Sequence, residues 1–306
     1  MSEKHTYKLC CGIDISATTV SVAIGGSAIA EVYFDEIAQN KSGYHSLDRR
    51  LQAYKIALTD TLLVMEATGT YWMSFARYFS HRGYHMSVVN PSIAHGYARS
   101  LLVYDKTDAL DARVLLDIAC YKQHDLRLWH PPPVIYEDIY QRLRERDQLV
   151  SMRTRLLNRQ HSRQQRVVYV DSVEKRKDDL QSLIDAQIQE IDTELITLYK
   201  SDHSWSDSAR YLLSIPGIGS VTAGWILVAT QNFETFETPQ QAAAFAGLVP
   251  RLYISGTSVK KRAKIGKGGH PRLRRALFIA AWNAARYNPH LKAFYNRLLA
   301  KKKPKN

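Results

Sequence analysis

The sequence has no long run of apolar residues, which excludes a helix that spans a membrane. None of its runs reaches the roughly 18 residues that such a span needs, and the polar segment 1–8 lacks the apolar core of a signal peptide. Cysteine is scarce as well. Cys10, Cys11 and Cys120 match no zinc-binding spacing, and so few thiols are typical of a reducing compartment. We therefore expect a cytoplasmic protein without membrane contact.

Acidic residues are missing from the end of the chain. Residues 1–200 hold 25 Lys and Arg against 25 Asp and Glu, whereas residues 201–306 hold 17 against 4 and so carry the entire net charge of +13. From Arg251 onward there are 16 basic residues and no acidic one. Such one-sided charge favours a polyanion as partner, most simply nucleic acid. A disordered basic tail is the alternative, which suits 301–306 but not the patterned, aromatic-bearing stretch before it.

The chain is long enough for more than one folded unit. Its 306 residues, 45% hydrophobic and 23% charged, are typical of a globular protein with two cores. The run His-Pro-Pro-Pro at 130–133 is a stiff break, and we place a domain boundary there. The predicted domains are 1–130, 131–203 and 204–306.

The first domain alternates between strand and helix patterns. Three strands in a meander come first, then a helix, a strand that reads as buried on both faces, a second helix, another strand and a last helix. The predicted strands are 9–16, 19–24, 29–34, 61–66 and 85–89, and the predicted helices are 46–57, 71–82 and one that opens at Asn90-Pro91. This order predicts an α/β fold, a mixed sheet with helices on its faces.

Four acidic residues in this domain are candidates for one site. Asp108 and Asp111 lie three residues apart in a helical stretch, so they share a face and repel each other unless a cation lies between them. Acids also favour the first turn of a solvated helix, and the pair alone fits that interpretation better. Asp14 lies on the first strand and Glu66 at the end of the fourth, where α/β sheets form their sites. If the four converge, they need a divalent cation to stay ionised.

The middle of the chain is helical. Residues 134–169 read as one helix with eight arginines between Arg142 and Arg166, a face suited to a phosphate backbone or, equally, to solvent and local ion pairs. Apolar residues then recur at coiled-coil spacing along 176–200, at Leu180, Ile184, Ile188, Ile191, Leu195 and Leu198. The sequence leaves open whether this seam packs within the chain or against a second copy.

Two glycines mark a second candidate for nucleic-acid binding. In 211–229 an apolar helix ends before Pro216–Gly219, which form a tight turn, and another helix starts at Ser220. This pattern resembles a helix-hairpin-helix, in which Gly217 and Gly219 let backbone amides approach a phosphate at a helix N-terminus. A plain helical hairpin is the alternative.

The basic region contains the remaining candidates. Ser255 precedes Gly256, so a substrate can approach its backbone, although a plain Ser-Gly turn is the better interpretation from spacing alone and Thr257 or Ser258 would serve equally. The cations that we expect to contact nucleic acid are Lys260, Lys261, Arg262, Lys264, Lys267, Arg272, Arg274 and Arg275. The last three open a predicted helix, where cations oppose the helix dipole unless a phosphate binds.

Motifs in both halves resemble one known family. Four motifs of the first domain are Gly-Ile-Asp-Ile-Ser (12–16), Met-Glu-Ala-Thr-Gly (65–69), Asn-Pro (90–91) and Lys-Thr-Asp-Ala-Leu-Asp-Ala (106–112). They resemble the DEDD domain of the 110 family of insertion-sequence transposases, which are also called bridge-RNA-guided recombinases. Those similar to its C-terminal transposase domain are Pro-Gly-Ile-Gly (216–219), Phe-Ala-Gly-Leu-Val-Pro (245–250), Ile-Ser-Gly-Thr (254–257) and the run 266–277. One departure is His270, where the resemblance leads us to expect Asn.

The resemblance implies a fold and a set of roles. The first domain is expected to have the RNase H fold, like RuvC-type Holliday-junction resolvases. Asp14, Glu66, Asp108 and Asp111 are expected to bind Mg²⁺, and Ser255 to be the nucleophile that links covalently to DNA. The family further implies donor and target DNA as substrates, a noncoding bridge RNA as guide, and a homodimer or homotetramer. Such an enzyme is expected beside the nucleoid in a bacterial cytoplasm.

The complete prediction combines α/β and all-α parts. We expect an RNase H-like mixed-sheet domain, a long helical coiled-coil middle and a mainly helical C-terminal domain with a helix-hairpin-helix-like segment. The expected activity is that of a DNA transposase or recombinase with a serine nucleophile. Two alternatives are a metal-dependent Holliday-junction-type nuclease that uses water and a nucleic-acid-binding scaffold without chemistry.

Overall fold

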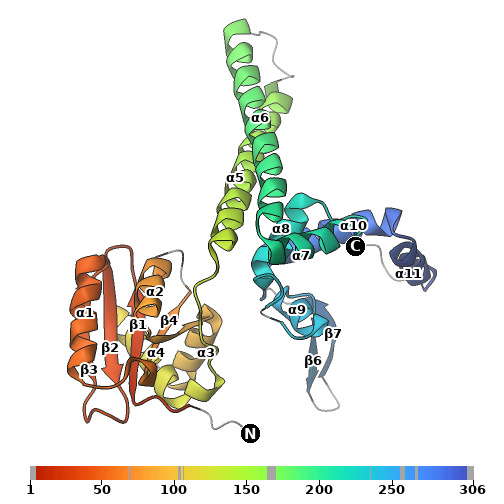
Figure 1. Cartoon of the computed structure of the whole chain (residues 1–306). Coiled ribbons are helices and arrows are strands. Elements are labelled where there is room, and N and C mark those ends of the chain that lie inside the picture. Colours follow the sequence, from red (N-terminus) through yellow and green to blue (C-terminus); the bar gives the residue numbers. More distant parts are fainter. Residues whose placement is uncertain are drawn as a thin grey trace. The chain divides into compact units, whose positions relative to one another are not determined.

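The chain divides into two compact units, 1–131 and 132–306, which we call unit 1 and unit 2 and describe separately (Figure 1). The structure is a computed structural model that describes residues 5–67, 69, 71–102, 105, 107–163, 170–234, 236–255, 259–265 and 268–301. The division falls within the proline run of 130–133. Across the described ranges, no helix is both long and apolar enough to cross a membrane.

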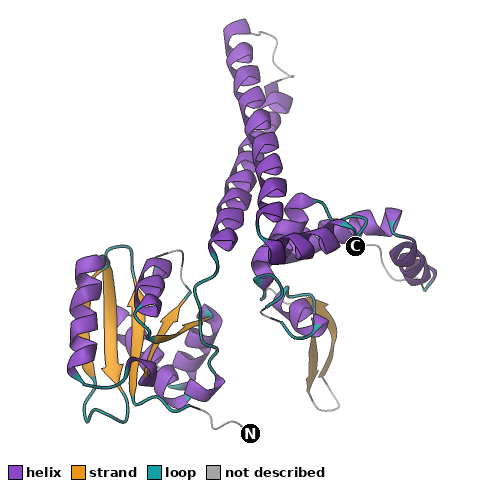
Figure 2. Cartoon of the chain, in the orientation of Figure 1, coloured by secondary structure: helices purple, strands orange, loops and turns teal. Residues whose placement is uncertain are grey.

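Unit 1 is built on a five-stranded mixed sheet (Figure 2). Its strands are β1 (Leu9–Ile15), β2 (Thr19–Gly25), β3 (Tyr33–Ala38), β4 (Thr61–Glu66) and β5 (His85–Val89), in the spatial order β3-β2-β1-β4-β5. The β1–β2 and β2–β3 pairs are antiparallel, whereas β1–β4 and β4–β5 are parallel. The predicted mixed sheet is therefore confirmed, in the arrangement expected of an RNase H-like domain.

The third strand lies later in the sequence than predicted. We expected it at 29–34, but β3 runs from Tyr33 to Ala38. Ile29 and Val32 belong to the β2–β3 connection, where both are partly buried against the hydrophobic core. The apolar residues of this packed loop resemble a strand in the sequence, which is why the predicted strand begins too early.

Helices cover both faces of the sheet. One face holds α1 (Lys41–Ala53) and α2 (Trp72–His81), and the other holds α3 (Pro91–Ser100) and α4 (Asp108–Tyr121). Two short 3₁₀ turns, η1 (Leu58–Asp60) and η2 (Gln123–Asp125), complete unit 1. Side chains of β1 alternate between these layers: Cys11 and Ile13 pack in the core under α1 and α2, and Cys10 packs in the core under α4.

The backbone of α4 lies very close to β1 at Gly12. A Cβ atom built on Gly12 would lie 2.0 Å from the carbonyl oxygen of Ala112 and 2.1 Å from the backbone nitrogen of Leu116. Both are backbone atoms of α4, so no side-chain adjustment can make room. The Sγ of Cys10 donates to the carbonyl of Ala119 at 3.6 Å, which shows that α4 runs back along β1. A residue without a side chain is therefore required here.

Unit 2 is mainly helical. Its elements are α5 (Val134–Arg163), α6 (Asp171–Ser201), α7 (His203–Leu213), α8 (Ser220–Thr230), α9 (Pro239–Phe245), β6 (Pro250–Ser255), β7 (Val259–Ile265), α10 (Pro271–Tyr287) and α11 (Pro289–Ala300). One core joins Leu143 of α5, Leu195 of α6, Trp205 of α7, Leu227 of α8 and Leu273 of α10. The helical middle thus shares its core with the C-terminal region, and the division at 203/204 into two domains stays a prediction.

Helix α6 packs against α5 of the same chain. Figure 1 shows α5 and α6 side by side, and ion pairs connect them in antiparallel order. Arg142 pairs with Glu194, Arg146 binds both carboxylate oxygens of Asp192 at 2.6 and 3.0 Å, and Arg153 pairs with Asp185 at 2.6 Å. The pairing of α5 with α6 is therefore intramolecular, while the coiled-coil seam as a whole stays a prediction, because its first residue, Leu180, is 45% exposed.

These ion pairs also change the interpretation of the arginine-rich helix. At least three of its eight arginines are neutralised by acids of α6, which favours an ion-paired face over a phosphate-binding one at those positions. Between Arg142 and Arg166 the helix itself contains only two acids, Glu145 and Asp147. The partners of Arg142, Arg146 and Arg153 lie about 30 to 50 residues further along the chain, so the local sequence does not reveal them.

We expect Gly12→Ala to displace α4 and to destabilise unit 1 by at least 1–3 kcal/mol, as overpacking typically does. The control is Gly96→Ala in α3, because a Cβ there would meet nothing within 4 Å. Alanine in a helix interior is more favourable than glycine by about 0.5–1 kcal/mol, so this control should be neutral or stabilising. Urea unfolding of both variants measures the difference, and equal stability of Gly12→Ala and the natural protein would disprove the contact.

Candidate functional site

Two of the four candidate acids lie side by side at the carboxyl ends of parallel strands. The β1–β4 register pairs Ile13 with Met65, so the next position along places Asp14 beside Glu66. Side chains alternate between the two faces of a strand, and Cys10 and Val64 point into the core under α4. Asp14 and Glu66 lie an even number of residues further along the same strands, so they face α4 as well. The fold therefore brings together two acids that are 52 positions apart in the sequence.

The other two acids form the first turn of α4. Thr107 caps this helix by accepting a hydrogen bond from the amide of Leu110 at 3.2 Å. Acids in a first helical turn are favoured by the helix dipole, which stabilises Asp108 and Asp111 even without a ligand. Because α4 packs against Gly12 and runs back along β1, its first turn is directed toward Asp14.

The pKa of Asp14 shows that the four acids converge. Burial is the largest cause that raises this pKa to about 6, and the negative charges of Asp111, Asp108 and Glu66 raise it further. A backbone hydrogen bond from Ile15 acts in the opposite direction. The residues that the sequence singled out are therefore close enough to repel one another.

A divalent cation fits this donor set chemically. Four carboxylates are hard oxygen ligands of the kind that Mg²⁺ prefers, and a cation would remove the repulsion that raises the pKa of Asp14. Among the described residues, no group of three or more His, Cys, Asp or Glu side chains already has the geometry to hold a metal ion. We call Asp14, Glu66, Asp108 and Asp111 the acid cluster.

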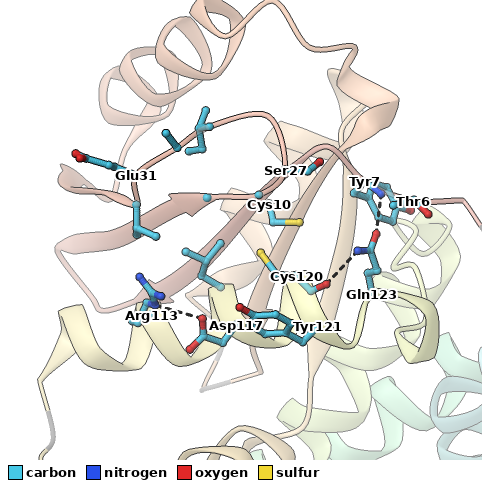
Figure 3. Close-up of a pocket in the computed structure, with 16 residues that line it drawn as sticks. Thr6, Tyr7, Cys10, Ser27, Glu31, Arg113, Asp117, Cys120, Tyr121 and Gln123 are labelled. Carbon is cyan, nitrogen blue, oxygen red and sulfur yellow. Dashed lines mark hydrogen bonds and ion pairs between the residues drawn. The ribbon is translucent and has the colours of Figure 1, made fainter.

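A separate cavity of about 340 Å³ lies at the opposite ends of β1 and α4. Figure 3 shows Cys10 and Cys120 on its wall, with the Arg113–Asp117 ion pair to one side. Cys10 precedes Asp14 by four strand residues, about 13 Å, and Cys120 lies in the last turn of the helix that Asp108 begins. This cavity is therefore not part of the acid cluster.

The two glycines of the hairpin-like segment have different surroundings. Gly217 has φ +103°, and a Cβ there would lie 2.9 Å from the carbonyl oxygen of Ala280 and 3.0 Å from the amide nitrogen of Ala284, so it packs against α10. Gly219 precedes α8 and has nothing within 4 Å of its would-be Cβ. Packing explains Gly217 without a ligand, while Gly219 leaves the N-terminus of α8 open. Phosphate binding there stays a prediction.

Ser255 ends a strand that the sequence did not predict. It is the last residue of β6 and pairs with Val259 of β7 in an antiparallel hairpin. Lys260 and Lys261 face Ile254 and Tyr253, so the basic strand runs directly beside the strand of the serine. Arg262 and Lys264 follow on β7, whereas Lys267 lies outside the described residues. Ser255 belongs to unit 2 and the acid cluster to unit 1.

Two of the three arginines that open α10 have partners within the protein. Arg272 pairs with Asp147 and lies over the ring of Trp225, 4.9 Å from its centroid. Arg274 donates to the carbonyl of Gly268 at 2.9 Å. Arg275 is exposed. Nucleic-acid binding by these three stays a prediction, and of the three Arg275 is the most accessible.

His270 caps α10, which explains how it takes the place of the expected Asn. Its Nδ1 accepts from the amide of Leu273 at 3.1 Å, and its ring stacks on Phe245 with centroids 5.5 Å apart. Burial lowers the pKa of the ring, which keeps Nδ1 unprotonated and able to accept. Asn is also a preferred N-cap, so both residues satisfy the same requirement.

The sheet, the acids at the ends of β1 and β4, and the helix that crosses β1 define a transposase domain of the DEDD class. A family model of that class, DEDD transposases of IS110 type, matches residues 11–165. A second, described as "Transposase IS116/IS110/IS902 family", matches residues 209–296. The chain belongs to this family of insertion-sequence transposases, whose members are DNA-recombining enzymes.

The chain is similar both to proteins named for gene inversion and to proteins named as transposases. A "Pilin gene-inverting protein" of Moraxella bovis is 32% identical over 269 residues, which cover 87% of this chain and 80% of the relative. The protein of the same name in Moraxella lacunata is 31% identical over the same shares. A "Transposase for insertion sequence element IS1328" of Yersinia enterocolitica is 24% identical over 85% of this chain and 83% of its own length.

Asp14→Asn is expected to stabilise the cation-free protein. A carboxyl whose pKa rises from 3.8 to about 6 on folding binds its proton more tightly when folded, so its ionised form destabilises the fold above pH 6. That cost fades as the pH falls from 6 to 3.8. Discounted for solvent at this half-buried group, the gain should be about 1 kcal/mol near neutral pH, or a few degrees in Tm. Thermal unfolding with a chelator measures it, Asp105→Asn is the control, and a lower Tm would contradict the repulsion.

His270→Ala should lower the free energy of unfolding by about 1 kcal/mol through the lost cap, whereas His270→Asn should retain it. Because burial lowers the pKa of His270, its contribution is present above the ordinary value of 6.5 and is lost as the pH falls from there through the folded pKa. The Asn variant should therefore resist mild acid better than the natural protein. Urea unfolding at neutral and mildly acidic pH tests this, and identical acid sensitivity of both proteins would refute it.

Proposed function

We propose that this transposase of an IS110-family insertion sequence cuts and rejoins DNA through a covalent bond to Ser255, with a divalent cation held by the acid cluster. The observation that carries the cation site is the raised pKa of Asp14, which burial raises most and which the charges of Asp111, Asp108 and Glu66 raise further. Acids at the start of a helix exposed to solvent and distant from β1 would not raise the pKa of Asp14. The convergence favours the functional interpretation of Asp108 and Asp111 over that of a solvated helix start.

Mg²⁺ is the proposed cation, and the residues that would hold it are Asp14, Glu66, Asp108 and Asp111. When bound, it would lower the pKa of an attacking hydroxyl and neutralise charge on the phosphorus centre. The chain supplies the arrangement: β1 and β4 fix two carboxylates, and the capped start of α4 presents the other two.

Ser255 is the proposed nucleophile. Its Oγ would attack a DNA phosphodiester, form a phosphoserine ester, and release a deoxyribose hydroxyl that takes up the proton. One ester bond forms as one breaks, so a second hydroxyl can later displace the serine and reseal the strand without another energy source. The support is the position of Ser255 at the end of β6, opposite the basic β7, because cations there would hold the phosphate.

Target choice is proposed to depend on a noncoding guide RNA. The sequence contains no finger, homeodomain or other base-reading motif. The excess of 16 basic residues from Arg251 onward suits binding to RNA and DNA backbones. Donor and target DNA, a homodimer or homotetramer, and a place beside the nucleoid in a bacterial cytoplasm belong to this proposal, and they rest on the family.

The same chemistry serves insertion and inversion. Two sites on separate molecules give transposition, and two oppositely oriented sites on one molecule give inversion of the segment between them. The relatives named for pilin gene inversion are similar along most of this chain. We propose that the protein acts on a mobile element, and that inversion is what the same reaction yields on such a paired substrate.

Ser255→Ala should abolish strand exchange and the covalent protein–DNA adduct, since no other step of the proposal forms that bond. The protein is incubated with DNA that carries the element ends, the RNA transcribed from the element's flank, and Mg²⁺, and the adduct is detected as a species resistant to denaturant. Thr257→Ala and Ser258→Ala are matched controls, because they remove hydroxyls from the same segment. Both should retain adduct formation.

Each alternative function predicts a different result. A nuclease that uses activated water should keep cutting after Ser255→Ala and should form no adduct. A scaffold without chemistry should bind nucleic acid in the natural protein and in Asp14→Asn, with no strand exchange in either. If the adduct depends on Thr257 or Ser258, the assignment of the serine is wrong while the reaction class stands.

A further inference from the structure

Helix α10 carries a stripe of large exposed side chains on the face that points away from its core. Phe278 is 60% exposed and Trp282 is 55% exposed, and both lie between exposed arginines at positions 275 and 286. The four residues Arg275, Phe278, Trp282 and Arg286 follow one another at spacings of 3, 4 and 4. We call them the α10 stripe.

The stripe lies opposite the buried side of the helix. Leu273, Ala276, Ala280 and Ala284 are buried, and they have the same spacings of 3, 4 and 4. The two sets are offset by two residues, which is about 200° around an α-helix. The alanines let the turn at Gly217 approach the backbone of α10. Packing within unit 2 therefore uses one side of α10 and leaves the aromatic side outward.

Exposure of this size is unusual for Trp282. The chain has five tryptophans, and two others in unit 2, Trp205 and Trp225, are each only 4% exposed. An exposed tryptophan one turn away from an exposed phenylalanine forms an apolar patch, and such a patch is typical of a surface that a partner covers. The question is which partner fits.

Charge identifies that partner as a polyanion. The chain from Arg251 to its end carries 16 basic residues and no acidic one, and it includes the whole stripe. Two such surfaces on two copies of the chain would repel each other. The adjacent α11 has the same character: Phe294 is 48% exposed, and the guanidinium of Arg297 lies over its ring at 5.2 Å from the centroid. Cations that alternate with aromatic rings are typical of nucleic-acid surfaces.

We propose that the α10 stripe binds unpaired nucleotides of a single-stranded nucleic acid, with Phe278 and Trp282 stacking on bases and Arg275 and Arg286 contacting phosphates. Rings on an outward helix face reach the flat surface of a base only if that base is not already stacked within a duplex. The stripe therefore selects single strands, such as RNA loops or displaced DNA, over duplex DNA. This deepens the proposed function by naming the strand state that unit 2 recognises.

Equilibrium binding tests the proposal without any catalytic step, so it can fail or succeed independently of the serine chemistry. Full-length protein is titrated into a short labelled single-stranded RNA, the same sequence as single-stranded DNA, and the matching duplex. Phe278→Ala and Trp282→Ala should each weaken single-strand binding about ten-fold and leave duplex binding nearly unchanged. Trp282→Phe should restore most of the affinity. Tyr287→Ala, which removes an exposed aromatic ring on another side of the same helix, is the control.

Two further measurements separate the roles within the stripe. Arg275→Gln and Arg286→Gln should each reduce the slope of log affinity against log salt by about 0.7, whereas the aromatic variants should leave that slope unchanged. Quenching of tryptophan fluorescence by the single strand should be much weaker in Trp282→Ala. The RNA and DNA arms show which single strand is preferred.

Specific outcomes would overturn the inference. Equal losses on single strands and duplex would make the stripe a general phosphate-binding surface. Unchanged affinity in Phe278→Ala and Trp282→Ala would remove the stripe from nucleic-acid binding altogether. If sedimentation shows that Trp282→Ala lowers the oligomeric state while oligonucleotide affinity is retained, the face binds a second copy of the chain instead.

Discussion

The contact between Gly12 and the backbone of α4 is the constraint on which the candidate site depends. Because β1 has no side chain at this position, α4 packs with its Ala112 and Leu116 backbone atoms against the strand. Its first turn then carries Asp108 and Asp111 to Asp14 two residues further along β1, and parallel pairing brings Glu66 to the same place. Burial of Asp14 and the repulsion among these acids destabilise the cation-free fold, and a divalent cation would offset that effect. Asp14 therefore lowers the stability of the cation-free fold, and the same carboxylate is proposed to bind the cation.

Unit 2 uses its positive charge in two ways. Arginines of α5 pair with acids of α6, and Arg272 pairs with Asp147, so part of the charge holds helices together. The chain from Arg251 onward contains basic residues and no acidic one. Several of these basic residues lie on β7, beside the strand that ends at Ser255. A count of arginines cannot separate the two uses. Only the pairing shows that Arg142, Arg146 and Arg153 of the arginine-rich helix bind acids of α6. The β6–β7 hairpin and the outer side of α10 keep cations that are available to a polyanion.

Several features were predictable because their signals are local. The buried strand 61–66, the Asn-Pro start of α3 and the proline break at 130–133 each depend on neighbours within a few residues. Others were not predicted. The third strand was placed too early because loop residues Ile29 and Val32 are apolar for packing reasons. The β6–β7 hairpin was missed because its second strand is mostly Lys and Arg, which lack the apolar alternation of a strand. His270 was expected to be Asn, and its cap and stacking on Phe245 explain the exchange.

By itself, the sequence determined the class of the protein: the order of strands and helices, the one-sided charge, and the motifs that contain Asp14, Glu66, Asp108, Asp111 and Ser255. These features are encoded in residue types and short spacings, which need no knowledge of distant contacts. Only the tertiary structure decided which residues meet. The convergence of the acids, the partners of the α5 arginines and the outward direction of Phe278 and Trp282 each depend on packing between segments far apart in the chain. Sequence spacing carries no information about such contacts, because they are set by how closely two backbones can approach.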